Sequence, residues 1–261
     1  MADLVRYEVR AGVAWIELHA PPANTYTHAM MRELDEAILR ARFDTAVHVL
    51  LLRGAGEKFF CAGADIRMLQ GADPPFKYQF CLHANETLNR LESTPKLVIA
   101  ALNGHAVGGG LEIALAADLR VARRGGGRIG LPEVSLGVLP GTGGTQRLVR
   151  VLGKARAIEL MATGRLLEFE EALSLGLIQR ILEPDGFEAQ LEAWAGEFVP
   201  PARASRAVGL LKRAVQSGAE MSLQEGLALE RELQQRLFES DDAAEGLAAY
   251  LEKRPPRFRG C

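Results

Sequence analysis

Two apolar runs of strand length constrain the fold of this chain more than any other feature. Residues 47–52 and 97–102 form these runs, and each is closed by a turn signal, Arg53-Gly54 after the first and Asn103-Gly104 after the second. Strands that are apolar on both faces are typical of parallel sheets that are covered by helices. We therefore predict a parallel sheet in the interior, with helices packed over it.

The neighbouring segments have the patterns that such a fold needs. Residues 5–9 and 13–18 alternate apolar and polar side chains on either side of Ala11-Gly12, which predicts an antiparallel hairpin. Apolar residues recur at helical spacing over residues 30–41 and again over residues 76–91. The order hairpin, helix, strand, helix, strand, helix predicts an α/β core with right-handed crossovers.

The last third of the chain has a helical pattern. From about Thr142 one helix follows another, and residues 178–182 are the only stretch there with a strand-like pattern. Residues 222–225 read Ser-Leu-Gln-Glu, the capping-box sequence that opens a helix. We expect a helical appendage on the α/β core.

Composition excludes several classes of protein. The chain has 261 residues and a formal net charge of −2, so its overall field recruits neither nucleic acid nor an anionic membrane. Its three cysteines are widely spaced, which favours a reducing compartment over a disulfide framework. The opening residues lack the pattern of a secretory signal, and no apolar run approaches the roughly 20 residues of a membrane span. We expect a soluble cytoplasmic protein.

A glycine run in the middle of the chain indicates a binding site for a negatively charged oxygen. Gly108, Gly109 and Gly110 precede an apolar helical pattern, so a ligand atom can approach the bare N–H groups at the helix start. The alternative is that the glycines only permit close packing of the helix on a sheet. The spacing fits neither a phosphate loop nor a dinucleotide fingerprint.

Two glutamates next to this run could act as acid and base. Glu112 interrupts the apolar helix start, and Glu133 follows Pro132, on a loop that leaves a short strand. When two carboxylates face one water, their mutual repulsion shifts their pKa values apart. One of them can then hold a proton while the other accepts one. The alternatives are a helix-terminus carboxylate for Glu112 and a surface charge for Glu133.

Two further small-residue turns are candidate parts of the site. Residues 59–67 lead from an apolar stretch into a short helix and could expose a second N–H donor, with Asp65 as the helix cap. Residues 141–145 enter another helix, and we interpret them as packing and positioning residues.

These pieces together resemble the crotonase superfamily, most closely its enoyl-CoA hydratase branch. The motifs that carry the resemblance run in the family's order over nearly the full length: FCAGADIR (60–67), NGHAVGGGLEIALAAD (103–118), GLPEVSLGVLPGTGGTQRL (130–148) and EKRPPRFRG (252–260). The resemblance implies an α/β fold, with a crotonase-like spiral core of ββα units over residues 1–195. It also implies an α-helical C-terminal trimerisation region over residues 196–261, and a homotrimer or dimer of trimers.

The resemblance also implies roles for individual residues. Ala64 and Gly109 match the residues whose N–H groups form the oxyanion hole, and Glu112 and Glu133 match the two catalytic glutamates. The positions that it implies for contact with acyl-CoA are Lys58, Ala62, Ala64, Asp65, Ile66, Arg67, Gly109 and Lys253, the last from a neighbouring subunit. The segment RRGGGR (123–128) makes the span between the two glutamates one residue longer than is usual, and we place the extra residue in a surface turn.

The implied reaction is addition of water to the 2,3 double bond of a 2-enoyl-CoA, or its reverse. No metal or redox cofactor is implied, and coenzyme A is part of the substrate. Both glutamates favour hydration over double-bond isomerisation, which commonly keeps one carboxylate, and they argue against a non-catalytic scaffold. The main alternative is a 3-methylglutaconyl-CoA hydratase, although no clear cation is available for the second carboxylate of that substrate. RNA binding by some relatives uses a lysine-rich early helix, whereas residues 30–44 contain no lysine.

Overall fold

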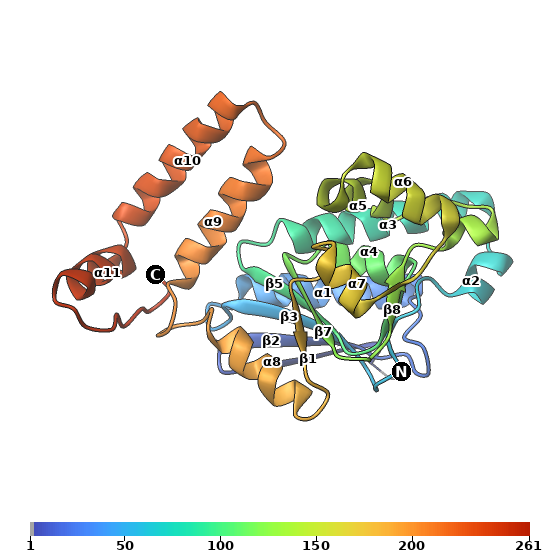
Figure 1. The fold of residues 1–261 in the computed structure, drawn as a ribbon, viewed down its shortest axis with the longest axis horizontal. Helices are drawn as coiled ribbons and strands as arrows, with labels where there is room; N and C mark the ends of the chain where they lie inside the picture. Colours follow the sequence, from blue (N-terminus) through green and yellow to red (C-terminus); the bar gives the residue numbers. More distant parts are fainter. Residues whose placement is uncertain (1–2) are drawn as a thin grey trace.

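The computed structural model describes residues 3–261, so Met1 and Ala2, at the start of the predicted core domain, lie outside the described residues. Figure 1 shows an α/β core from which three C-terminal helices extend to one side. The core consists of two sheets and the helices that cover them. Within residues 3–261, no helix combines the length and the apolar character that a membrane span requires.

The larger sheet contains both apolar runs at its centre. Its six strands have the order β1-β2-β3-β5-β7-β10. They are β1 (Val5–Arg10), β2 (Val13–Leu18), β3 (Val49–Gly54), β5 (Leu97–Leu102), β7 (Leu119–Arg123) and β10 (Arg180–Leu182). The pair β1–β2 is the predicted antiparallel hairpin, and all other pairs in this sheet are parallel. The predicted buried parallel sheet is confirmed.

The smaller sheet lies against the larger one, where its first strand contacts β3 and β5. Its strands, in the order β4-β6-β8-β9, are β4 (Phe59–Cys61), β6 (His105–Val107), β8 (Arg128–Gly130) and β9 (Leu167–Glu168). Because β9 lies after Thr142, the prediction that residues 178–182 are the only strand-like stretch there was wrong. A strand of two residues is too short to leave an alternating pattern.

Helices cover both faces of the larger sheet. Those before residue 200 are α1 (His28–Phe43), α2 (Ile66–Gly71), α3 (Pro74–Glu92), α4 (Gly109–Leu115), α5 (Gly144–Leu152), α6 (Lys154–Thr163), α7 (Phe169–Ser174) and α8 (Phe187–Gly196), with a 3₁₀ turn, η1 (Glu133–Leu136). Successive residues of the central strands point to opposite faces. Leu50 and Leu52 pack with α1, α3 and α4, while Leu51 packs with Leu191 and Trp194 of α8.

The two sheets meet where glycines let their backbones touch. A Cβ on Gly54 would lie 2.3 Å from the Phe60 carbonyl oxygen, and one on Gly104 would lie 2.3 Å from the Lys58 carbonyl carbon. The Asn103 side chain accepts from Gly54 N (2.9 Å) and donates to the Gly54 (3.1 Å) and Gly56 (2.7 Å) carbonyls. The turn signals that close the apolar strands therefore also fix β4 against them.

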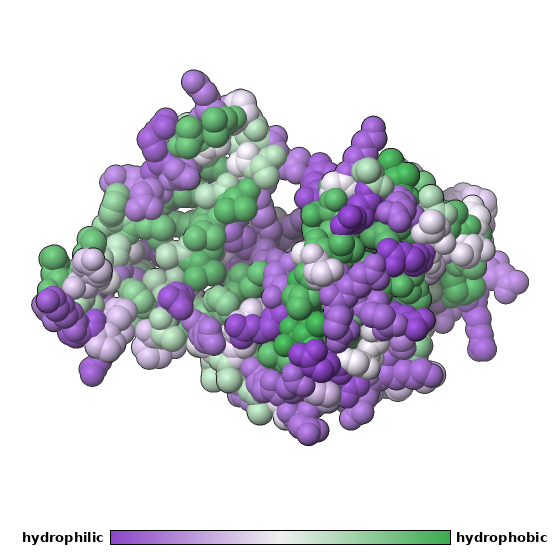
Figure 2. All heavy atoms as spheres, in the orientation of Figure 1, coloured by the Kyte–Doolittle hydropathy of each residue, from purple (hydrophilic) through white to green (hydrophobic). Residues whose placement is uncertain are grey.

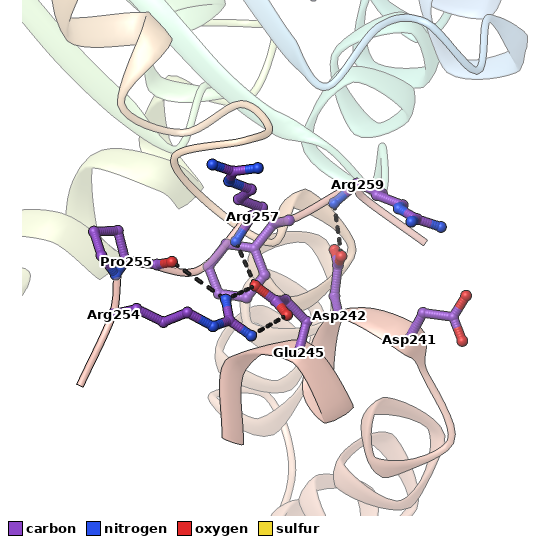
Figure 3. Close-up of a pocket in the computed structure, with 8 residues that line it drawn as sticks. Asp241, Asp242, Glu245, Arg254, Pro255, Arg257 and Arg259 are labelled. Carbon is purple, nitrogen blue, oxygen red and sulfur yellow. Dashed lines mark hydrogen bonds and ion pairs between the residues drawn. The ribbon is translucent and has the colours of Figure 1, made fainter. Parts of the chain in front are cut away.

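The C-terminal helices extend from the core, with apolar side chains exposed along them (Figure 2). They are α9 (Ser205–Gly218), α10 (Leu223–Phe238) and α11 (Asp241–Leu251), and the predicted capping box of Ser222 and Glu225 opens α10. The chain end folds back on α11 and lines a hollow with it (Figure 3). There Glu245 pairs with Arg254 (2.6 Å), and Asp242 accepts from Arg259 N (2.7 Å).

A buried ion pair attaches α9 to the core. Lys212 Nζ lies 2.8 Å from Asp118 Oδ2 and also donates to the Lys96 carbonyl at 3.1 Å. Asp118 accepts in addition from Val98 N (2.7 Å) and Gln216 Nε2 (2.9 Å). Removing one partner of such a pair leaves an uncompensated buried charge.

We therefore expect Lys212→Met to lower the free energy of unfolding by about 3 kcal/mol, measured by urea denaturation. Arg150→Met, which breaks the exposed ion pair with Glu220, is the control and should leave the unfolding midpoint close to that of the wild type. Adding Asp118→Asn to Lys212→Met should recover part of the loss. Equal unfolding midpoints for Lys212→Met and Arg150→Met would contradict the assignment.

Candidate active site

The glycine run forms the start of helix α4. Gly108 has a φ of 58°, which favours glycine, and Leu111 N and Glu112 N both donate to its carbonyl. Gly109 is the first residue of the helix, so its N–H has no acceptor within the helix. Close packing also requires these glycines, since a Cβ on Gly110 would lie 2.0 Å from the Cys61 carbonyl oxygen. The packing interpretation of the run is therefore confirmed, and the N–H of Gly109 remains available for the predicted anion site.

Ala64 lies beside this helix start, as the second N–H donor requires. Tyr26 N donates to Gly63 O (2.9 Å) and Asp65 N donates to Tyr26 O (3.0 Å), which forms a parallel bridge. In this bridge Tyr26 bonds to the residues before and after Ala64, so the N–H of Ala64 itself points away from Tyr26. A Cβ on Gly63 would lie 3.2 Å from Gly109 N, so the two predicted donor segments are in contact.

The other residues predicted on this stretch continue from β4 into α2. Ala62 N donates to the Ala23 carbonyl (3.0 Å), and Asp65 caps α2 by accepting from Met68 N at 2.8 Å, as predicted. Ile66 and Arg67 are exposed on the first turn of α2.

Glu112 is buried and held by the turn that precedes α5. Only 2% of its surface is exposed, and Oε1 accepts from Thr142 N (2.8 Å) and Gly144 N (2.7 Å). Oε2 accepts from the Thr142 hydroxyl. The interpretation of residues 141–145 as positioning residues is confirmed. Burial raises the pKa of Glu112, and these hydrogen bonds oppose that shift by favouring the charged form.

Sequence reasoning missed the arginine that fixes this turn. The buried Arg147 donates to the Thr142 carbonyl (3.4 Å), to Glu92 (2.7 and 3.0 Å) and to Asn89 (2.8 Å). It thereby connects the turn to α3, more than 50 residues earlier. An arginine in an amphipathic helix gives no signal of such a partner, so the pattern of α5 could not have revealed it.

Glu133 approaches the same helix start from the other side. It begins η1 just after β8, and its Oε1 lies 2.9 Å from the point that a Cβ on Gly108 would occupy. Its Oε2 is buried without a hydrogen-bond partner, so Glu133 is not a freely solvated surface charge. Burial, with a smaller contribution from the charge of Glu112, raises the pKa of Glu133 to about 7.

The longer span between the two glutamates does not displace them. Arg124 and Gly125 lie in an exposed turn between β7 and β8, where the extra residue was predicted. β8 still pairs with β6 in register, with Val107 opposite Gly130, and Gly108 N donates to Gly130 O at 2.9 Å. This ladder brings η1 alongside the first turn of α4.

The site therefore combines two carboxylates in different environments with two backbone donors. Glu112 accepts three hydrogen bonds, whereas Glu133 has an unpartnered oxygen and a pKa near neutrality. One group can accept a proton while its neighbour holds one, which is the arrangement of an acid–base pair. Among residues 3–261, no group of three or more potential ligand side chains (His, Cys, Asp or Glu) is arranged to hold a metal ion.

The two predicted lysines are both exposed. Lys58 is exposed before β4, with its Nζ 5.7 Å from the centre of the Phe59 ring. Lys253 is exposed and follows α11, and that helix lies at the end of the molecule away from α2 and α4 (Figure 1). The hollow of Figure 3 also lies in that region, and its Glu245 and Arg254 are already paired with each other.

Comparison with known proteins gives matches along the whole chain. Residues 8–261 match the family described as Enoyl-CoA hydratase/isomerase. A probable enoyl-CoA hydratase of Rhizobium meliloti is 39% identical, over 97% of this chain and 96% of that protein. The short-chain-enoyl-CoA hydratase of Clostridium acetobutylicum is 37% identical, over 95% and 94%. A solved enoyl-CoA hydratase structure from Geobacillus kaustophilus has a TM-score of 0.96 and 44% identity, over 100% of this chain and 98% of that one.

The raised pKa of Glu133 predicts a pH-dependent change in stability. Below the unfolded value of about 4.5 the carboxyl is protonated in both states. Between that value and the folded value of about 7 the unfolded chain releases this proton while the folded protein keeps it, so stability falls as pH rises, and the loss is complete above about pH 7. Glu133→Gln should therefore equal the wild type in stability near pH 4.5 and exceed it at pH 8, as measured by chemical denaturation. The exposed Glu86→Gln is the control for loss of one charge. A constant difference between wild type and Glu133→Gln across this range would contradict the environment described for Glu133.

Proposed function

The chain belongs to the enoyl-CoA hydratase/isomerase family, and from this premise we propose that it adds water across the 2,3 double bond of a 2-enoyl-CoA, or removes water from a 3-hydroxyacyl-CoA. This is the chemistry of a hydro-lyase. The observation that carries the proposal is the pairing of Glu112 and Glu133 beside the N–H groups of Ala64 and Gly109.

The thioester oxygen binds between the N–H groups of Ala64 and Gly109 in the proposed mechanism. Water, oriented and deprotonated by Glu112, forms a bond to the β-carbon, while the π electrons move toward the thioester oxygen to give an enolate. One oxyanion donor contributes about 3–4 kcal/mol to lowering the barrier. Glu133 then gives its proton to the α-carbon, and a pKa near neutrality suits that task. Dehydration reverses these steps.

Substrate contacts follow from the position of each segment relative to the donors. Ala62, Asp65, Ile66 and Arg67 flank Ala64 where β4 runs into α2, so we assign them to the acyl-CoA. Lys58 is assigned to the phosphates of coenzyme A. Lys253 follows α11, which lies at the end of the molecule away from α2 and α4. We therefore assign it to the site of a neighbouring subunit. Coenzyme A arrives with the substrate, and the scheme needs no further cofactor.

The alternatives within the family receive less support. An isomerase needs a single carboxylate to move a proton, whereas here two carboxylates lie at the same helix start. The relatives compared above have names that refer to enoyl-CoA or short-chain enoyl-CoA, which does not specifically favour the branched 3-methylglutaconyl-CoA. RNA binding would need a basic surface, and α1 has acidic residues as well as arginines.

We further infer that the region of residues 196–261 assembles the protein into a trimer or a dimer of trimers. Large apolar side chains are exposed along its helices (Figure 2), and exposed apolar patches of this kind mark protein interfaces. They are Leu211, Val215, Leu223, Leu227, Phe238, Leu247, Tyr250 and Leu251. The free thiols of Cys61, Cys81 and Cys261 suit a reducing compartment such as the cytoplasm.

Hydration is tested by mixing the protein with crotonyl-CoA or 3-methylglutaconyl-CoA and following the loss of enoyl-thioester absorbance. We expect turnover of at least one, with Glu112→Gln and Glu133→Gln each slower by about 100-fold or more. Glu86→Gln is the matched control on the exposed face of α3 and should keep wild-type rates. A wild-type rate in either active-site variant would remove that residue from the mechanism.

Assembly is tested by analytical ultracentrifugation. The wild type should sediment as a trimer or hexamer. The double variant Leu211→Asp/Val215→Asp should form smaller species, because both side chains lie on α9 and are more than 60% exposed in the single chain. Circular dichroism checks that the variant keeps its helices. A monomeric wild type would overturn the assembly proposal and, with it, the assignment of Lys253.

A further inference from the structure

Tyr26 contacts both segments that supply the proposed oxyanion donors. It precedes α1, is only 2% exposed, and its backbone bonds to Gly63 and Asp65 on either side of Ala64. Its side chain covers Gly109, where an added Cβ would lie 2.3 Å from the Tyr26 hydroxyl oxygen and 2.5 Å from Cε1. One residue thus sets the positions of two segments that lie about 45 positions apart in the sequence.

Aromatic packing keeps the Tyr26 ring in this place. The ring stacks on Phe80 of α3, with a centroid separation of 5.7 Å and an interplanar angle of 28°. Phe80 in turn stacks on Phe76, at 6.3 Å and 5°. Because the stack is anchored in a long helix, the ring has little freedom to move away from Gly109.

The hydroxyl of Tyr26 reaches the group that holds Glu112. The hydroxyl lies within interaction range of the Thr142 side chain, whose own hydroxyl donates to Glu112 Oε2. Burial and the charge of Glu112 raise the pKa of Tyr26 well above its usual value, although the Thr142 side chain lowers it, so the hydroxyl stays protonated. The Thr142 hydrogen is given to Glu112, so a bond between the two hydroxyls requires Tyr26 to be the donor. A hydroxyl that accepts from one partner becomes a stronger donor to the next.

We propose that Tyr26 is a positioning residue for the hydration reaction: its ring fixes Gly109 against Gly63, and its hydroxyl holds the Glu112 carboxylate through Thr142. The role rests on the proposed function, because it assumes that Glu112 activates water. Only 2% of the Tyr26 surface is exposed, and its ring packs against Gly109. It therefore acts on rate through the geometry of its neighbours.

Four charged or titratable groups around Glu112 influence its pKa. They are Arg147 on α5, Glu133 on η1, Cys81 on α3 and Tyr26 itself. Arg147 favours the ionised form of Glu112, while Glu133 opposes it when it is itself ionised. Removing the Tyr26 hydroxyl leaves these three groups in place and weakens only the donor at Oε2, so the pKa of Glu112 should rise.

The first test is Tyr26→Phe, which keeps the ring and removes the hydroxyl. With crotonyl-CoA we expect kcat to fall about 3- to 10-fold with KM within about 2-fold of the wild type. The acid limb of the pH profile of kcat should move to higher pH by about half a unit, because Glu112 must be ionised to act. A purely structural role would change stability and leave the pH profile in place. Wild-type kcat and an unmoved acid limb would overturn the role of the hydroxyl.

The second test is Tyr26→Leu, which also removes the ring from Gly109. Acetoacetyl-CoA is the probe, because its enolate has an ultraviolet band of its own and carries the oxyanion that the two N–H groups would bind. Tyr26→Phe should bind this enolate as the wild type does, and Tyr26→Leu should bind it at least about 10-fold more weakly. Wild-type affinity in Tyr26→Leu would overturn the role of the ring.

Tyr7→Phe is the matched control, since Tyr7 lies on β1 and its hydroxyl is also buried, without a partner. It should keep wild-type kcat and pH profile. Failure of the wild type to hydrate either enoyl-CoA would sink the proposed function itself. A hydrating wild type whose Tyr26→Phe variant is indistinguishable from it would sink only the role of the Tyr26 hydroxyl, so the two failures are distinct.

Discussion

The close approach of three backbone segments around the first turn of α4 is the constraint on which the rest of the site depends. A Cβ at any of three glycines would displace a neighbour. On Gly63 it would meet Gly109 N, on Gly109 the Tyr26 ring, and on Gly110 the Cys61 carbonyl. Because these segments touch, the N–H groups of Ala64 and Gly109, which are distant in sequence, lie close enough to bind one oxygen atom in the proposed mechanism. The cost of ordering glycine is met by the buried core around β4 and α4.

Different local environments give different pKa values to the two glutamates that meet at this helix start. Glu112 is the more deeply buried, yet three donors from the turn at residues 142–144 oppose the rise in its pKa. Glu133 is less buried, yet burial raises its pKa to about 7, and one of its carboxylate oxygens has no donor to offset that rise. The same type of side chain therefore suits two opposite proton-transfer tasks, and the difference comes from hydrogen-bond donors rather than from depth alone.

The C-terminal helices add a second level of organisation. A buried ion pair between Lys212 and Asp118 fixes the start of this region to the large sheet, while its outer surfaces expose leucine and valine side chains. Two carboxylates of α11 hold the final residues against that helix: Asp242 accepts from the backbone of Arg259 and Gly260, and Glu245 pairs with Arg254. The ending EKRPPRFRG therefore has a structural explanation within one chain. The exposed apolar surface remains for contact between subunits in the proposed assembly.

The sequence by itself determined the α/β core, the hairpin, the main helices and the segments that form the site, because each leaves a local signal: apolar runs, helical spacing, glycine turns and a capping box. The resemblance of four ordered motifs also predicted roles for Ala64, Gly109, Glu112 and Glu133, and the structure brings their segments together at the start of α4. Only the tertiary structure decided that Arg147 and Thr142 hold Glu112, that Tyr26 covers Gly109, and that a two-residue strand, β9, completes the small sheet. These contacts join residues far apart in the chain, and neither periodicity nor turn chemistry records which distant side chain will fill a given space.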